Sequence, residues 1–168
     1  MGEYLKKILA GQFEAALCML NHCVQACPPE RWEGKIANLS FRQVAYHTLF
    51  FVDAYLSPNQ EAFQMRELNR RGGDERQPKP TPGLSKEETL QYLDICRRKA
   101  TEALGAETRE SLEGPSGFPR RKISRGELHI YNIRHVQHHT GQLSAFLRRI
   151  DRLREKEEAL PWVGTGWQ

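Results

Sequence analysis

Long apolar runs and paired cysteines are what this 168-residue chain lacks. No stretch approaches the roughly 18 apolar residues that a membrane-spanning helix needs, so we expect no membrane segment. The first residues, MGEYLKKILAGQF, are basic, but no apolar run with a small-residue cleavage site follows them as in an export signal. Without an export signal, the four cysteines fit a reducing compartment. Together these absences predict a cytoplasmic protein.

The cysteines themselves allow two interpretations. None of them forms a CxxC pair, but Cys23 and Cys27 are four residues apart on a predicted helix. That spacing permits a metal clip, and it equally suits small hydrophobic side chains that pack on one helix face. We favour the packing interpretation.

Charge gives no strong sign of a nucleic-acid partner. The net charge is +4, with acids and bases mixed along the chain. Three short basic clusters occur: Arg97-Arg98-Lys99, Arg120-Arg121-Lys122 and Arg148-Arg149. Acids follow each cluster closely, at Glu102, Glu127 and Asp151, as on ordinary solvated helix faces. A nucleic-acid site would require the clusters to share one face, and we do not expect such a site.

Apolar residues recur at steps of three and four and predict an all-α protein. The pattern marks four long helices, over residues 3–27, 41–56, 84–104 and 124–156. Ser40 with Gln43, and Ser85 with Glu88, have the form of capping boxes at two helix starts. We find no long strand and no internal repeat. Four amphipathic helices of this length predict a four-helix bundle formed by residues 1–168 as one domain.

The connection over residues 57–83 is unusually long and contains several prolines and a glycine pair. It predicts a crossover, with a short helix over residues 60–69, and it is either a lid or a structureless link. Its arginines are suited to covering an anionic substrate or cofactor: Arg66, Arg70, Arg71 and Arg76. Residues 157–168 form a non-helical, tryptophan-rich tail that we expect to pack back on the bundle or to join an oligomer contact.

Histidines are concentrated in the segment RHVQHHTGQL, residues 134–143. His135 and His139 are four residues apart, so a helix places them on one face. Counted at about 100° per residue from Leu128, both fall within about 20° of the apolar centre of this helix. We therefore expect both inside the bundle, with His138 at the margin. His129 and His22 are interpreted as surface or packing residues.

A stacked pair of core imidazoles needs polar partners, because a buried imidazole without a hydrogen bond is costly. A divalent metal satisfies this need, and so does a hydrogen-bonded pair with Tyr131 and Gln142 as partners. His47, on the second helix, lies at the edge of that helix's apolar stripe. It is either a histidine at a helix–helix seam or a third ligand. Three protein ligands leave a position open, as in catalytic rather than structural zinc sites.

Three stretches carry a resemblance to a known family. AYHTLFF on the second helix, H-x-x-H-H-x-G-Q-L on the last and the segment PERWEGKIANLSFRQVAYH resemble the DinB/YfiT-like superfamily. The resemblance implies a four-helix bundle with a long crossover, often dimeric. It also implies a divalent metal held by His47, His135 and His139. Similar proteins include metal-dependent thiol transferases and isomerases that use low-molecular-weight thiols.

These observations predict a metal-dependent enzyme of the hydrolase or thiol-transferase type. It would act on a small-molecule substrate, with a divalent metal and a low-molecular-weight thiol as cofactors, and would form a homodimer. Tyr131 and Gln142 would hydrogen-bond the ligands, while zinc, nickel and manganese suit three imidazoles alike. No catalytic residue is assigned. The alternative is a non-catalytic, metal-stabilised helical module that acts through dimerisation or a protein partner and whose metal site a fourth protein ligand closes.

Overall fold

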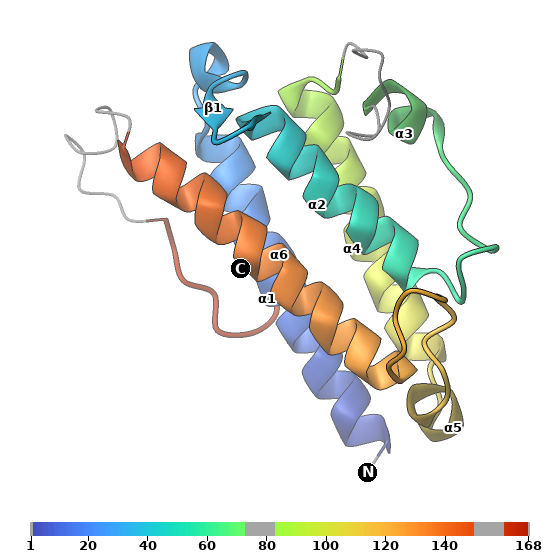
Figure 1. Cartoon of the computed structure of the whole chain (residues 1–168). Coiled ribbons are helices and arrows are strands. Elements are labelled where there is room, and N and C mark those ends of the chain that lie inside the picture. The colour runs from blue at the N-terminus through green and yellow to red at the C-terminus, as the bar shows by residue number, and fades with distance from the viewer. Residues whose placement is uncertain (1, 73–82, 150–159, 168) are drawn as a thin grey trace.

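Four long helices dominate the computed structural model, which describes residues 2–72, 83–149 and 160–167 (Figure 1). They are α1 (Gly2–Ala26), α2 (Phe41–Leu56), α4 (Lys86–Ala106) and α6 (Arg125–Arg149). Short elements connect them: the 3₁₀ turn η1 (Pro29–Arg31) and the helices α3 (Glu67–Gly72) and α5 (Arg109–Glu113). Two two-residue strands, β1 (Lys35–Ile36) and β2 (Leu39–Ser40), pair antiparallel ahead of α2.

The long helices pack as a bundle in which α1 and α2 each contact both α4 and α6. In Figure 1 the chain ascends through α1, descends through α2 and α4, and ascends again through α6. Because α2 and α4 run in the same direction, the chain must return along the bundle between them. This confirms the predicted all-α fold and its long crossover. None of the described helices is long and apolar enough to cross a membrane.

Local sequence signals set the helix starts. Ser40 and Gln43 form the predicted capping box at α2, and Ser85 and Glu88 form the one at α4. In each box, two backbone N–H groups that the helix leaves unpaired gain a side-chain acceptor. The bounds of α2 agree with the sequence expectation. The predicted end of the last helix at residue 156 lies outside the described residues.

The short helix of the crossover was wrongly placed. It was expected over residues 60–69, but α3 begins only at Glu67. Asn59 Oδ1 accepts a hydrogen bond from the Ala62 N–H at 2.8 Å, and Asn69 Oδ1 accepts one from the Arg66 N–H at 2.7 Å. Asparagine side chains that bind nearby backbone in this way favour turns over helix. The preceding residues therefore form turns and extended backbone.

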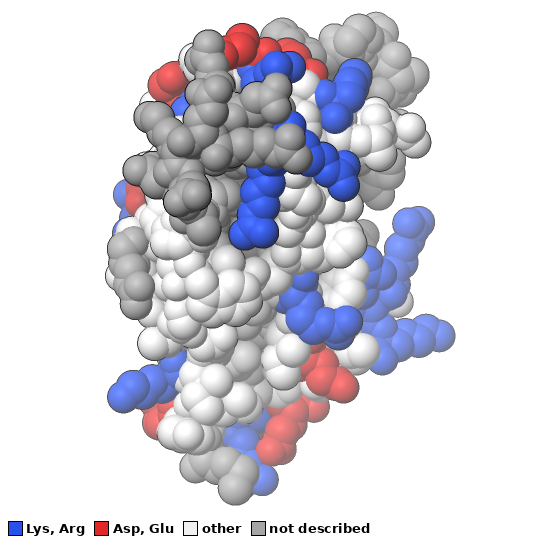
Figure 2. Space-filling model, turned by 90° about the vertical axis from the view of Figure 1, so that its left-hand side faces the viewer, with Lys and Arg blue, Asp and Glu red and all other residues white. Residues whose placement is uncertain are grey.

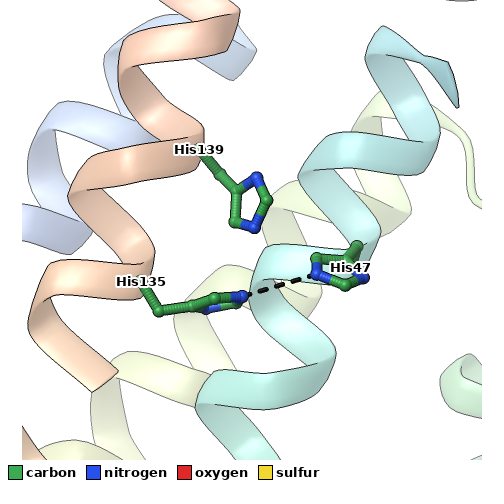
Figure 3. A group of neighbouring side chains, drawn as sticks. All are labelled: His47, His135 and His139. Atoms are coloured by element: carbon green, nitrogen blue, oxygen red, sulfur yellow. Dashed lines mark hydrogen bonds between the residues drawn. The ribbon is translucent and has the colours of Figure 1, made fainter. Parts of the chain in front are cut away.

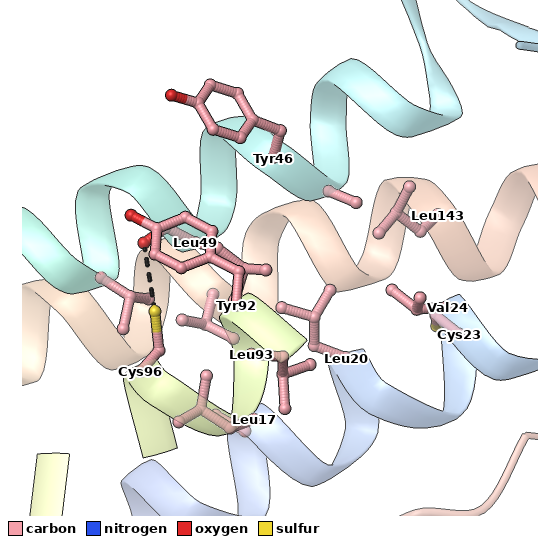
Figure 4. Close-up of a cluster of buried hydrophobic side chains, with 14 of the residues drawn as sticks. Leu17, Leu20, Cys23, Val24, Tyr46, Leu49, Tyr92, Leu93, Cys96 and Leu143 are labelled. Atoms are coloured by element: carbon pink, nitrogen blue, oxygen red, sulfur yellow. Dashed lines mark hydrogen bonds between the residues drawn. The ribbon is translucent and has the colours of Figure 1, made fainter. Parts of the chain in front are cut away.

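The bundle core is built from leucines on all four long helices (Figure 4). Leu17, Leu49, Leu93 and Leu143 are each almost completely buried and come from α1, α2, α4 and α6 respectively. All four cysteines are buried as well, and burial raises the pKa of Cys23 to about 12. A buried thiol of that pKa stays protonated, and among the described residues no cysteine belongs to a group that could hold a metal ion, which agrees with the packing role.

The described part of the tail lies along α1. The Gly166 N–H donates to the Gly11 carbonyl at 2.9 Å, and Gln12 Nε2 donates to the Gly164 carbonyl at 3.0 Å. Val163 is buried against α1. Residues 160–167 therefore pack back on the bundle without forming a helix.

A buried arginine joins three helices at one end of the bundle. Arg125, the first residue of α6, donates from Nε to Glu107 Oε1 at 2.8 Å. Its two other nitrogens donate to the carbonyls of Tyr55, Leu56 and Ser57 at 2.9–3.3 Å. These carbonyls end α2 and lack partners within the helix. Arg125 thus caps α2 and ties it to the end of α4 and the start of α6.

His129 completes this junction. It is fully buried, and its Nε2 lies 2.8 Å from Glu107 Oε1, so it is a packing residue rather than a surface residue. Burial raises the pKa of Glu107, but hydrogen bonds from Ser111, Arg125 and His129 outweigh burial and hold the pKa below its usual value. Glu107 therefore stays ionised and balances the charge of Arg125.

Replacing Arg125 by methionine is expected to destabilise the protein by about 3–5 kcal/mol, because it leaves a buried carboxylate and three carbonyls without their donor. Chemical denaturation followed by circular dichroism measures the free energy of unfolding. Arg98→Met is the matched control, since Arg98 makes an exposed pair with Asp94, and its effect should stay within about 0.5 kcal/mol. Equal losses in the two variants would contradict the role given to Arg125.

Candidate metal centre

Two antiparallel helices bring the three predicted histidines together. His47 extends from α2, and His135 and His139 extend from α6 toward the same point (Figure 3). Each offers one ring nitrogen, and these atoms all lie within 4.8 Å of one another. The Nε2 atoms of His47 and His135 are 3.4 Å apart. The three histidines therefore form the predicted cluster, although His47 lies about ninety residues before the other two in the chain.

The cluster lies at the edge of the core. All three histidines are half-buried, whereas we expected His135 and His139 inside the bundle. The error came from the assumed centre of the apolar stripe. The buried face of α6 passes through Val136 and Leu143, while Phe146, which helped to define the expected centre, is only half-buried. The histidines therefore face the seam between α2 and α6, which leaves them accessible.

Protonation favours metal binding at this point. Burial, together with the neighbouring His139 and His47, lowers the pKa of His135 to about 3. His135 is therefore neutral at pH 7. Neutral imidazole is the form that binds metal ions, so no proton has to be displaced from His135.

Gln142 supports one member of the cluster. Its Oε1 lies 2.8 Å from His139 Nδ1, and its Nε2 lies 3.4 Å from Nε2 of the exposed His138. An acceptor at Nδ1 places the ring proton there and leaves the Nε2 lone pair of His139 available. Tyr131 behaves differently from expectation, because its hydroxyl accepts a hydrogen bond from Arg121 and not from a histidine.

A hydrogen-bonded histidine pair leaves one ring nitrogen of the cluster without a partner in the described residues. Nδ1 of His135 is buried and has no partner among the residues the structure describes. Its Nε2 faces another imidazole. A metal ion fits this arrangement, because zinc–nitrogen bonds of about 2.0–2.1 Å in tetrahedral geometry set ligand nitrogens about 3.3–3.4 Å apart. The 3.4 Å between the His47 and His135 nitrogens agrees with that separation, and the three ligand atoms together lie within 4.8 Å of one another.

The described residues add no fourth protein ligand to this group. Phe51 packs against it, with its ring centre 4.9 Å from that of His47 and 5.6 Å from that of His135. Beside His135 a hollow of about 560 Å³ opens along α6, lined by Tyr131, Arg134, His135, Gln137 and His138. With three protein ligands and access to solvent, a metal bound here would keep one coordination position open, whereas a fourth protein ligand would close it.

The arginines of the crossover do not assemble over this centre in the described residues. Arg66 Nε donates to Asp53 Oδ2 at 3.2 Å, on the side of α2 that faces α4. Arg76 and the side chains of Arg70 and Arg71 lie outside the described part of the chain. The lid hypothesis thus stays a prediction.

The basic clusters serve separate contacts. On α4, Arg97 lies 4.3 Å over the Trp167 ring and Lys99 donates to Asp53, whereas Arg121 bonds two tyrosines near α6. Arg148 and Arg149 lie at the far end of α6, across the bundle from α4. In Figure 2, Lys and Arg side chains stand in separate groups divided by uncharged surface.

A helical bundle with a three-histidine group that could hold a divalent metal fits the class of helical bundles with a candidate metal site, and comparison identifies the family. The DinB superfamily matches residues 12–143, most of the chain. The protein belongs to the DinB superfamily, as the resemblance implied. Neither the curated proteins nor the solved structures contain a significant match.

Replacing Gln142 by alanine is expected to weaken zinc binding by about 10- to 100-fold, because His139 loses the acceptor that fixes its ring. Isothermal titration of the metal-free protein measures the affinity. Gln137→Ala is the control, since Gln137 lies on the same helix but donates to Met19 Sδ. Unchanged affinity in Gln142→Ala would show that the contact with His139 does not orient a ligand.

Proposed function

We propose that this protein is a divalent-metal-dependent enzyme whose ligands are His47, His135 and His139. The observation that carries the proposal is the convergence of three imidazoles from two helices, two of them 3.4 Å apart, at a point that solvent can reach. Membership of the DinB superfamily supports the same assignment.

The centre suits the activation of a small nucleophile. A divalent cation bound to three imidazoles lowers the pKa of a water or thiol at its open position. Two groups of the protein position and shield the ligands. Gln142 holds His139 in one tautomer, and the Phe51 ring covers His47 and His135 on one side. No residue of the described part is assigned as a general base.

Two reaction types fit an activated nucleophile: hydrolysis, and transfer to or from a low-molecular-weight thiol. The resemblance to thiol-using members of the superfamily favours a thiol as co-substrate. The substrate would be a small electrophilic molecule. Zinc, nickel and manganese each suit three nitrogen ligands, so the metal has to be identified by measurement.

A homodimer is part of the proposal. Tyr4 and Ile8, one turn apart on α1, and Ile130 on α6 are large apolar side chains that remain exposed. Exposed apolar side chains of this kind suit an association surface. The second candidate is a non-catalytic module that acts through such a surface. It differs from the enzyme because a fourth protein ligand would close its metal site.

Metal analysis of untagged protein tests the central assignment. We expect about one divalent metal per chain in the wild type and none in His139→Ala. His138→Ala is the matched control, because His138 is the adjacent histidine but is exposed, and it should keep its metal. Added zinc at 100 times its dissociation constant should stabilise the wild type by about 2.7 kcal/mol. A wild type that carries no metal and gains no stability from zinc, nickel or manganese would refute the proposal.

Cobalt substitution separates the enzyme from the non-catalytic module. If a coordination position is open, 2-mercaptoethanol should bind there and change the visible absorption spectrum of the cobalt-loaded protein. A spectrum that is insensitive to the thiol and to azide would indicate a closed site and favour the module.

A further inference from the structure

An aromatic cleft with two arginines adjoins the metal centre. Its volume is about 450 Å³, within the range of sites that hold small organic molecules. Aromatic side chains from α2, the crossover and the loop before α6 form its walls: Phe50, Phe51, Tyr55, Phe63 and Phe118. Its polar lining consists of Gln60, Arg120 and Arg121. Such walls suit a flat, apolar body, because ring faces and edges pack well against one another.

The guanidinium of Arg121 is held in place at the cleft. Its Nη2 donates to the Tyr55 hydroxyl at 3.1 Å and to the Tyr131 hydroxyl at 3.2 Å. Its central carbon lies 5.0 Å from the centre of the Tyr131 ring. Two phenols therefore fix the orientation of the cation without neutralising it.

The loop that carries Arg121 is itself fixed against the end of α2. Ser116 Oγ donates to the Arg121 carbonyl at 2.6 Å, and the Gln60 N–H donates to the Gly117 carbonyl at 3.1 Å. Gly117 has a φ of +80°, and a Cβ there would come within 2.5 Å of the Pro58 carbonyl oxygen. Only glycine permits this close approach. Arg121 is thus preorganised by the backbone as well as by its side-chain contacts.

The cleft is positively charged, and its described lining contains no acid. Several other arginines pair with acids, among them Arg66, Arg98 and Arg125. Within the described ranges, no carboxylate pairs with Arg120 or Arg121, and Nε of Arg121 is buried without a hydrogen-bond partner. A partly shielded guanidinium without an acid favours an anionic ligand, carboxylate or phosphate above all.

The cleft and the metal centre share a wall. Phe51 lines the cleft and also packs against His47 and His135. Tyr131, which receives the hydrogen bond from Arg121, lies one helical turn before His135. A molecule in the cleft would therefore lie next to the metal centre, across the Phe51 side chain, although no histidine lines the cleft itself.

We propose that this cleft is the substrate pocket of the metal centre and that it binds a small aryl carboxylate, with the carboxylate at Arg121 and the ring between the phenylalanines. The assignment of this ligand as substrate rests on the proposed function. Binding to the cleft itself does not require the metal. Ligand binding to the cleft and the proposed metal-dependent function can therefore be tested separately.

The experiment is a titration of 2-naphthoate, followed by ligand-observed NMR, into metal-free and zinc-loaded protein. The neutral amide, 2-naphthamide, has the same ring without the charge, and acetate has the charge without the ring. We expect 2-naphthoate to bind about tenfold more tightly than the amide, as a charge-assisted hydrogen bond would provide. Acetate should not bind measurably. Removing the metal should leave these results unchanged.

Arg121→Gln should weaken 2-naphthoate binding by about tenfold and leave 2-naphthamide binding nearly unchanged. Arg98→Gln is the matched control on the exposed face of α4 and should behave as wild type. If a thermal melt shows that Arg121→Gln does not fold, Arg120→Gln replaces it. Arg120 is exposed, and a drop of about two- to threefold is expected there.

Several outcomes would overturn the inference. Equal affinity for the acid and the amide, no effect of Arg121→Gln, or binding only in the zinc-loaded form would each exclude Arg121 as the anchor. Intact metal binding without 2-naphthoate binding would refute the cleft assignment alone. Arg121-dependent 2-naphthoate binding in a protein that takes up no metal would refute the proposed function alone.

Discussion

The position of every candidate functional group depends on the contact of Arg125 with the end of α2. That contact fixes how far α6 is displaced along α2, since Arg125 binds the last carbonyls of the antiparallel helix. His47 lies nine residues before Leu56, and His135 lies ten residues after Arg125. At 1.5 Å per residue these distances are about 14 and 15 Å along the two helices. The two imidazoles therefore arrive at the same height, which is why their Nε2 atoms face each other at 3.4 Å.

Signals confined to a few residues predicted much of this structure. The capping boxes at Ser40 and Ser85 set two helix starts correctly, because the hydrogen bonds involved span only three residues. The spacing of His135 and His139 likewise predicted a shared face. Burial was less predictable. His129 was expected at the margin of its helix, yet it is fully buried, because its partner Glu107 comes from the far end of α4. No local pattern in the sequence reveals such a partner.

The role of Arg121, beside the metal centre, could not be predicted from local sequence patterns either. Tyr131 was expected to bond a metal ligand, since it lies one turn from His135 on the same helix. Its hydroxyl instead accepts a hydrogen bond from Arg121, on a loop whose path depends on the contact of Gly117 with the end of α2. Arg121 itself belongs to a basic cluster that appeared to be an ordinary solvated loop. A cation stands out as functional only when the fold shows that it faces an aromatic cleft with no acid in its described lining.

Helices and loops contribute differently to the centre. The three histidines stand on α2 and α6, two rigid helices that Arg125 joins through its hydrogen bonds to the last carbonyls of α2, so the bundle framework sets their mutual distances. The neighbouring cleft combines three aromatic side chains of α2 with residues of the crossover and of the loop at Gly117, and connecting loops vary most between related proteins. Family membership therefore bears on the metal and says little about the substrate. The loop residues Phe63, Phe118 and Arg121 add two aromatic side chains and a positive charge to the cleft, so we expect them to determine what it binds.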